Sequence, residues 1–169
     1  MNPQKQFADS LEEMEKVLRE ERIGYLGLTG QGFPYVIPLN YGYADGRILF
    51  HCALEGTKLD CIRAKPRVCF AVGRQFGEVV DHPQGASCHI NSDSVLCFGT
   101  ARILEDLHER HSALDAFNRC LQPDAGPIRL EDIATCYAVE ITVAVMTGRT
   151  ERDGKCTYGK HEFVAEPTS

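Results

Sequence analysis

A glycine, a threonine and a lysine stand together at residues 56–58, where a short helix is expected to begin. The N terminus of a helix carries free amide hydrogens and a partial positive charge, so it attracts phosphate groups. Thr57 would add a hydroxyl, Lys58 a full positive charge, and Gly56 would let the backbone approach a ligand closely. The same residues suit an ordinary helix start, in which Thr57 caps the helix and Lys58 is solvated. The triplet alone leaves both interpretations open.

A histidine near the end of the preceding strand is the second candidate for chemistry. Alternation along that strand points Leu49, His51 and Ala53 to one side and Phe50 to the other. An imidazole beside a bound aromatic ring could donate a hydrogen bond, stack on the ring, or deliver a proton to a reduced substrate. A half-buried histidine bonded to a backbone carbonyl would look the same in the sequence.

The chain contains eight cysteines, most of them inside apolar runs such as RVCFAV and SVLCFG. They are Cys52, Cys61, Cys69, Cys88, Cys97, Cys120, Cys136 and Cys156. Because no export signal accompanies them, we expect buried free thiols that act as small apolar side chains. No CxxC pair is present, so neither a zinc ribbon nor a thioredoxin-type redox site is supported.

Histidines at two places could in principle ligate a metal. Cys88 and His89 are adjacent, with His82 nearby, and His108 and His111 are spaced i, i+3 on an expected helix. Neither group has the paired spacing or the additional acidic or cysteine ligands of a metal site. We therefore expect surface or half-buried histidines and no metal.

Length and charge restrict the class of protein. The chain has 169 residues, of which 43% are hydrophobic and 25% charged, as in a single soluble domain. Its formal net charge of −6 argues against sequence-independent nucleic-acid binding, which needs a basic surface. The sequence has no apolar run of membrane-spanning length and no signal-peptide pattern, so we expect a cytoplasmic protein.

Periodicity predicts a mainly β chain with flanking helices. We expect helices over residues 10–22, 57–64 and 106–121, the first opened by a capping box of Ser10 and Glu13, and one more helical turn over 129–135. We expect three strands between 22 and 53, and further strands over 67–73, 94–104 and 137–149. The sequence between 74 and 93 reads as a long loop or irregular hairpin, and 150–169 as a polar tail.

Two features of the first three strands bear on topology. Asp45-Gly46 is a strong hairpin signal between the second and third strands. Pro38 lacks an amide hydrogen, so the second strand must break, or lie at an edge, near Pro38-Leu39-Asn40. Short hairpin connections favour antiparallel pairing, and hence a closed or partly closed β-barrel with helices at its rim. GxGxxG and P-loop motifs are absent.

Several of these segments together resemble a known family. The run PYVIPLN, a hairpin, then FHCALEGTK, a short helix and PRVCF is similar to the core of the FMN-binding split-barrel superfamily of pyridoxamine 5′-phosphate oxidase. Within it, the resemblance is closest to the nitroimidazole-resistance (nitroreductase-like) proteins. It continues through SVLCFGTARILED and covers about residues 10–149 of a single domain that spans 1–169. The implied fold is an antiparallel split β-barrel.

The resemblance also implies a homodimer with FMN at the subunit interface. The positions that match the family's flavin site fall into four groups along the chain. They are Pro38, Leu39 and Asn40 along the isoalloxazine ring, His51 and Ala53 on the ligand side of the third strand, Thr57 and Lys58 at the phosphate, and Ser94 and Val95 from the other subunit. His51 is the candidate catalytic residue.

The implied activity is an FMN-dependent oxidoreductase that reduces a small electron-poor compound, such as a nitro compound or a quinone, with electrons from a reduced donor. The sequence departs from the oxidase itself, because it lacks the basic C-terminal segment that holds the phosphorylated vitamin and ends instead in TYGKHEFVAEPTS. Two alternatives stay open on the same barrel. One is a non-catalytic flavin- or haem-binding protein, and the other is a deazaflavin-dependent reductase, which the net acidity disfavours.

Overall fold

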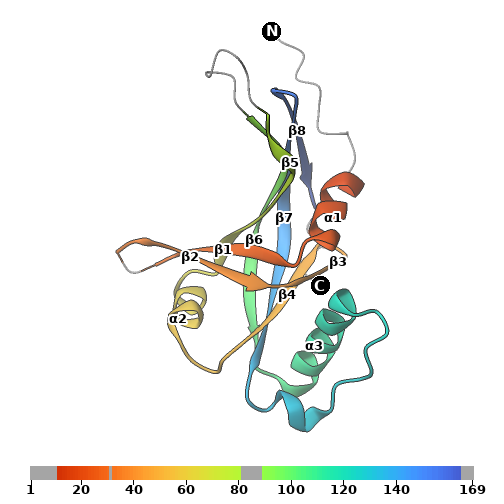
Figure 1. The fold of residues 1–169 in the computed structure, drawn as a ribbon. Helices are drawn as coiled ribbons and strands as arrows, with labels where there is room; N and C mark the ends of the chain where they lie inside the picture. The colour runs from red at the N-terminus through yellow and green to blue at the C-terminus, as the bar shows by residue number, and fades with distance from the viewer. Residues whose placement is uncertain (1–10, 31, 81–88, 165–169) are drawn as a thin grey trace.

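The computed structural model describes residues 11–30, 32–80 and 89–164. Its elements follow the order helix, four strands, helix, two strands, helix, two strands (Figure 1). They are α1 (Leu11–Glu20), β1 (Ile23–Thr29), β2 (Pro34–Asn40), β3 (Gly42–Ala44), β4 (Arg47–Cys52), α2 (Thr57–Ala64), β5 (Arg67–Val80), β6 (His89–Leu104), α3 (Leu107–Leu121), the 3-10 turn η1 (Leu130–Ile133), β7 (Tyr137–Arg152) and β8 (Lys155–Glu162).

All the strands belong to one antiparallel sheet, in the order β2-β1-β5-β6-β7-β4-β3, with β8 added on β7. One edge of β7 serves two partners, because β4 pairs with its first half and β8 with its second half. Among the described residues, the end strands β2 and β3 do not pair, so the sheet curls without closing. The predicted antiparallel split barrel is confirmed.

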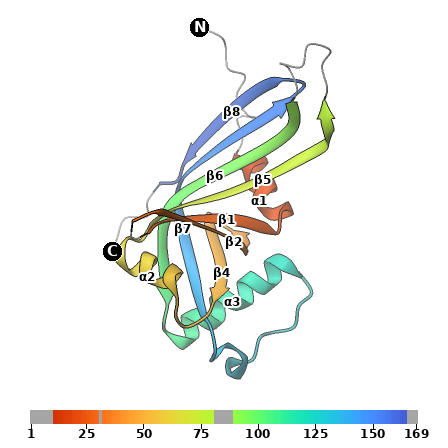
Figure 2. The same ribbon diagram turned by 60° about the vertical axis from the view of Figure 1, so that its left-hand side comes forward.

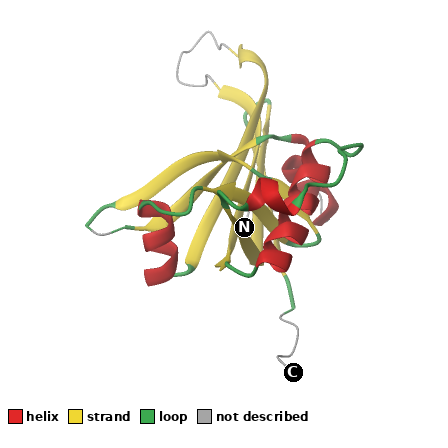
Figure 3. Ribbon diagram, turned by 90° about the horizontal axis from the view of Figure 1, so that it is seen from below, coloured by secondary structure: helices red, strands yellow, loops and turns green. Residues whose placement is uncertain are grey.

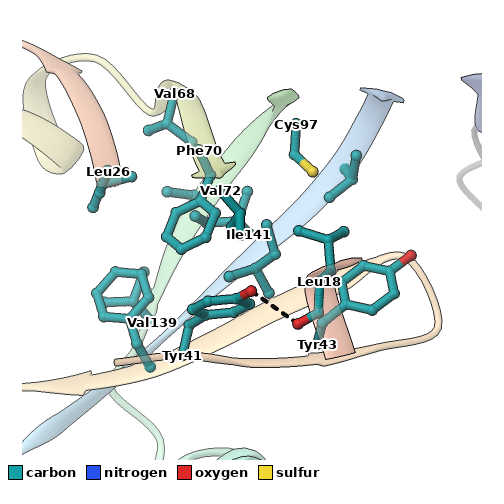
Figure 4. Close-up of a cluster of buried hydrophobic side chains, with 14 of the residues drawn as sticks. Leu18, Leu26, Tyr41, Tyr43, Val68, Phe70, Val72, Cys97, Val139 and Ile141 are labelled. Carbon is teal, nitrogen blue, oxygen red and sulfur yellow. Dashed lines mark hydrogen bonds between the residues drawn. The ribbon is translucent and has the colours of Figure 1, made fainter. Parts of the chain in front are cut away.

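The main core lies inside this curled sheet, and Tyr41 is at its centre. Tyr41 links β2 to β3, is 1% exposed, and packs edge-on against Phe70 with ring centroids 4.9 Å apart. Its hydroxyl donates a hydrogen bond of 2.8 Å to the carbonyl oxygen of Leu18 near the end of α1 (Figure 4). Burial raises the pKa of the Tyr41 hydroxyl, so it remains a neutral donor. This contact ties helix α1 to the point where the sheet turns back on itself.

The helices lie on different sides of the sheet (Figures 2 and 3). Helix α1 packs its buried face into the main core, against β3, β5, β6 and β7. Helix α3 lies on the outer face of β3, β4 and β7, where Leu49, Leu114 and Phe117 belong to a second, smaller cluster. Helix α2 packs near β1 and β6. None of the helices in the described ranges has both the length and the apolarity to cross a bilayer.

The turn and edge signals in the sequence are confirmed. Asp45 and Gly46 both have positive φ, 50° and 72°, as a tight hairpin between β3 and β4 requires. Pro38 pairs with Tyr25 of β1, and β2 has no other neighbour, so Pro38 lies on an edge strand. The strand ends at Asn40, one residue before the buried Tyr41.

The strands of one end of the sheet extend further than predicted. Of the two alternatives for residues 74–93, the irregular hairpin is confirmed and the long loop is wrong, since β5 continues to Val80, β6 already begins at His89, and their pairing shifts register between Phe76 and Val80. The polar tail contains β8, which extends the hairpin begun by β7. Together these segments form a four-stranded arm that leaves the barrel. Its polar side chains give no one-sided hydrophobic alternation, which is why the sequence did not reveal it. The predicted helix over 57–64 is confirmed, whereas the limits 10–22 and 106–121 were one or two residues too wide. Ser10 of the predicted capping box lies outside the described residues.

A buried carboxylate holds the base of the arm. Asp93 of β6 is 4% exposed and accepts hydrogen bonds from Arg74 Nε at 3.0 Å and Arg152 Nη2 at 2.7 Å. Both guanidinium groups lie over the ring of Phe76, at 5.0 and 4.4 Å from its centroid. Arg74 also pairs with Glu20 of α1. The network therefore joins β5, β6, β7 and α1 through one carboxylate.

The seven described cysteines are free thiols, as the sequence predicted. Cys52, Cys61 and Cys97 are buried in the main core. Burial raises the pKa of the Cys97 thiol to about 12, so at physiological pH this side chain is a neutral, apolar group.

Replacement of Gly24 should destabilise the core. A Cβ at Gly24→Ala would lie 2.2 Å from Cζ of the buried Phe70, which leaves no room for a methyl group. We expect a loss of about 2–3 kcal/mol in the free energy of unfolding, measured in urea. Gly126→Ala is the matched control, because its Cβ would meet no atom within 4 Å. Equal effects at the two glycines would contradict this packing.

Neutralising Asp93 should weaken the base of the arm. Asp93→Asn leaves Arg74 and Arg152 without their shared carboxylate, and we expect a loss of about 3 kcal/mol in the free energy of unfolding. Glu162→Gln breaks a solvent-exposed ion pair with Lys160 and should leave the free energy of unfolding nearly unchanged. A loss at Asp93 no larger than at Glu162 would show that the network contributes little to stability.

Candidate functional site

The N terminus of α2 is open, as a phosphate site requires. Gly56 is the N-cap residue, with φ of 128°, and no side chain among the described residues caps the helix. Its carbonyl oxygen accepts from the amides of Leu59 and Asp60, at 2.9 and 3.3 Å. The amides of Thr57 and Lys58 come too early in the helix to have an intrahelical acceptor. The interpretation of Thr57 as the helix cap is wrong, because Thr57 is the first residue of the helix itself.

A cavity of about 330 Å³ adjoins this helix end. We call it the α2 cavity, and it lies between α2 and the β1–β2 hairpin. It is lined by Gly30, Phe33, Pro34, Tyr35, Thr57, Asp60 and Cys61. Free amides, the Thr57 hydroxyl and the nearby Lys58 suit a phosphate group, whereas Asp60 is the lining residue that opposes one. Lys58 is half-buried, with Nζ 5.3 Å from the ring centroid of Phe50. The donors around the helix end therefore fit a phosphate-bearing ligand.

The β2 residues predicted to lie along a flavin ring are at the far end of the strand from Pro34 and Tyr35, which line the α2 cavity. Pro38 and Asn40 are exposed, while Leu39 turns inward and packs against the main core. The Asn40 side-chain amide donates to the carbonyl oxygen of Arg22 at 3.2 Å, which fixes its orientation. Since β2 is an edge strand, its outer backbone groups are free to bind a ligand.

The predicted alternation along β4 is confirmed. Phe50 faces the main core and Leu49 the second cluster, so His51 also points to the outer face. The His51 ring is exposed and lies edge-on to Phe117 of α3, with centroids 5.5 Å apart. Ala53, just beyond the strand, is exposed as well.

His51 lies at a second cavity, of about 410 Å³, beneath α3, which we call the α3 cavity. Its lining residues come from β4, α3 and the segment between α3 and β7. They are His51, Leu114, Phe117, Asn118, Gly126, Pro127, Ile128, Asp132, Ile133 and Cys136. The imidazole is therefore placed to act on a small molecule bound under α3.

The predicted site residues do not meet in one cavity. Thr57 lines the α2 cavity together with the start of β2, and His51 lines the α3 cavity. The other predicted residues of β2, β4 and α2 line neither cavity: Pro38, Leu39, Asn40, Ala53 and Lys58. Ser94 and Val95 lie apart from both, in the middle of β6 and not at its start as predicted. The Val95 side chain is fully buried in the main core, so only its backbone could meet a ligand. Whether a second copy brings this part of β6 to the site stays a prediction.

Sequence reasoning missed the residues that build the α3 cavity. Arg110 is 8% exposed, and it donates to the carbonyl oxygens of Leu104, Glu105 and Cys136 at 3.2, 2.8 and 3.2 Å. A signal existed, because Arg110 shares the helical face of Leu114 and Phe117 at spacings i+4 and i+7. A charged residue on an otherwise apolar face indicates a buried side chain with backbone partners.

His108 and His111 are exposed and half-buried side chains, as predicted. His111 Nε2 lies 2.6 Å from the carbonyl oxygen of Ile128, and His108 is exposed at the start of α3. Within the described ranges no group of three His, Cys, Asp or Glu side chains could hold a metal ion. His82 and Cys88 lie outside those ranges.

The sequence profile of the pyridoxamine 5′-phosphate oxidase family matches residues 10–150. No curated protein matches the chain by sequence. The profile covers most of the chain, including both cavities and every predicted site residue.

Solved structures share the fold. A protein assigned to 5-nitroimidazole antibiotic resistance from Bacteroides thetaiotaomicron is 25% identical, with 83% of each chain covered and a TM-score of 0.72. An FAD-binding protein from Mesorhizobium loti is 26% identical over 85% of this chain and 96% of its own, with a TM-score of 0.65. An FAD and haem binding protein from Mycobacterium smegmatis, 15% identical over 96% and 88%, has a TM-score of 0.74 and shows the fold alone.

Proposed function

The chain belongs to the pyridoxamine 5′-phosphate oxidase family, and we propose that it is a flavin-dependent oxidoreductase that acts on a small electron-poor compound, a nitro compound or a quinone. A bound flavin would supply the transfer of hydride or single electrons between a reduced donor and that compound. The observation that carries the proposal is the α2 cavity, which joins an uncapped helix N terminus to the edge strand β2. One structural relative, 26% identical, is named as an FAD-binding protein, which supports flavin binding.

The residues at the N terminus of α2, on β2 and at the end of β4 have separate tasks in this proposal. The α2 amides, Thr57 and Lys58 hold the phosphate of FMN, the one flavin for which this single phosphate site suffices. Pro38 and the backbone of Leu39 and Asn40 position the ring along β2. His51 and Ala53 approach from β4, and His51 delivers a proton to the reduced substrate.

The outer face of the sheet supports a homodimer. Apolar side chains between 38% and 60% exposed lie on β2, β1 and β6: Ile23, Tyr25, Val36, Leu96 and Phe98. Strand β5 lies between β1 and β6, and its half-buried Cys69 and Ala71 connect the two sides of this surface in register. Such a continuous apolar surface is typical of a subunit interface. We propose that a second copy covers it and contributes Ser94 and the backbone of Val95 to the flavin site.

The first test is the absorption spectrum of the protein purified without added cofactor, followed by chromatography of the released ligand. A flavin spectrum and released FMN would support the proposal. Released FAD would support flavin chemistry but contradict the choice of FMN. A Soret band would contradict it in favour of haem binding, and a colourless protein that fails to bind added flavin would overturn it.

Removal of the Lys58 ammonium should weaken flavin binding. Lys58→Ala deletes a charge-assisted contact to phosphate worth about 1.5–3 kcal/mol, which corresponds to about a 10- to 150-fold rise in the dissociation constant for FMN. The constant is measured by quenching of flavin fluorescence. Lys65→Ala, at the opposite end of α2, should leave it unchanged. Unchanged affinity in Lys58→Ala would sink the phosphate assignment.

Loss of the His51 imidazole should affect turnover and not cofactor content. If His51 donates a proton to the reduced substrate, His51→Ala should lower kcat by about 100-fold while the flavin content per chain stays the same. His108→Ala, an exposed histidine on α3, is the control. A variant with normal kcat and a normal pH profile would show that His51 has a structural role only.

A further inference from the structure

The α3 cavity has the size and surface of a small-molecule site. Its volume, about 410 Å³, falls within the range common for ligand pockets. Leu114, Phe117 and Ile133 form its floor, and all three are buried members of the second cluster. A planar ring placed there would bury apolar area against an aromatic and two aliphatic side chains. Asn118 adds an amide that can donate to a nitro or carbonyl oxygen.

The walls of this cavity are held in place by two side chains of α3. The buried Arg110 donates to the carbonyl oxygen of Cys136 and lies over the ring of Tyr137, 4.7 Å from its centroid. His111 Nε2 bonds to the carbonyl oxygen of Ile128 at 2.6 Å. These contacts attach the middle and the C-terminal end of the segment between α3 and β7 to the helix. The cavity is therefore built into the fold.

The charge around the cavity is negative. Asp132 is the one acidic residue among the described lining residues. Its two carboxylate oxygens accept from Arg129 at 3.0 Å each, but Arg129 is shared with Glu131 at 2.8 Å. Two carboxylates and one guanidinium leave a net charge of −1 at this rim. An anionic ligand would meet repulsion at this rim, and the described lining residues include no lysine or arginine to offset it.

We propose that the α3 cavity binds the electron acceptor, and that it selects an uncharged aromatic compound over an anionic one, phosphate esters included. This inference rests on the proposed oxidoreductase function, since His51 at the cavity rim is the link to the cofactor. It names a substrate class that lacks the phosphate from which the family takes its name.

The test compares two probes that differ in charge, 4-nitrobenzyl alcohol and 4-nitrobenzoate. Each is titrated calorimetrically into the full chain, with and without bound flavin, because this chain alone lines the cavity. We expect the alcohol to bind at least about 10-fold more tightly than the carboxylate in both forms. Equal affinities, or tighter binding of the carboxylate, would overturn the inference.

A cavity-filling variant locates the binding. Gly126→Phe places a ring in the cavity wall at a position where a Cβ meets no atom within 4 Å, so the fold should tolerate it. We expect at least a 10-fold loss of affinity for the alcohol. Gln122→Phe is the control, because it adds the same side chain to the same segment outside the cavity. It should bind the alcohol with unchanged affinity. If Gly126→Phe binds the alcohol with unchanged affinity, the inference is overturned.

The charge of the rim is tested by a matched pair of neutralisations. Asp132→Asn and Glu131→Gln each remove one carboxylate from Arg129, but only Asp132 lines the cavity. We expect Asp132→Asn to reduce the preference for the alcohol by about 2- to 5-fold, as for an exposed charge, and Glu131→Gln to change it less. If Glu131→Gln reduces the preference for the alcohol more than Asp132→Asn does, the assignment of Asp132 to the cavity rim is contradicted.

Flavin titration of the same samples separates the two proposals. A protein that binds the alcohol selectively but no flavin would support the cavity and overturn the oxidoreductase function. A protein that binds flavin but neither probe would overturn the cavity assignment while the flavin site stands.

Discussion

The fold depends on one buried residue that joins the two ends of its sheet. Tyr41 follows β2, the first strand in the sheet order, and precedes β3, the last. Its ring packs on Phe70 and its hydroxyl is bonded to the Leu18 carbonyl, so the same side chain fixes the curl of the sheet and the position of α1. The edge strand β2, and with it one wall of the α2 cavity, is positioned by this constraint.

Strand β4 presents side chains of different function on the two faces of the sheet. Phe50 faces inward beneath Lys58, while His51 faces outward to Phe117. Because α2 begins a few residues after β4, a single hairpin strand supplies both the phosphate end of the proposed flavin site and the rim of the α3 cavity. The period-two geometry of a strand is what separates these roles.

The sequence predicted the barrel well where local chemistry decides the structure. Asp45-Gly46 has to turn, and Pro66 has to end the helix that begins at Thr57. The sequence did not predict the features that depend on contacts between residues far apart in the chain. The arm is held by the charges around Asp93, which leave no hydrophobic period to read. The role of Arg110 depends on carbonyl groups more than twenty residues away, at Ile133 and Cys136.

The pairing of β4 with β7 also has a consequence for how the chain folds. The paired residues lie about 90 positions apart in sequence, so β4 has no partner on that edge until the last quarter of the chain has been made. Contacts of such long range slow folding, because the closure of the intervening loop must precede any gain in stability. During synthesis on the ribosome, the curled sheet is therefore completed only after β7 emerges. Until then, the edge of β4 that will pair with β7 remains unpaired.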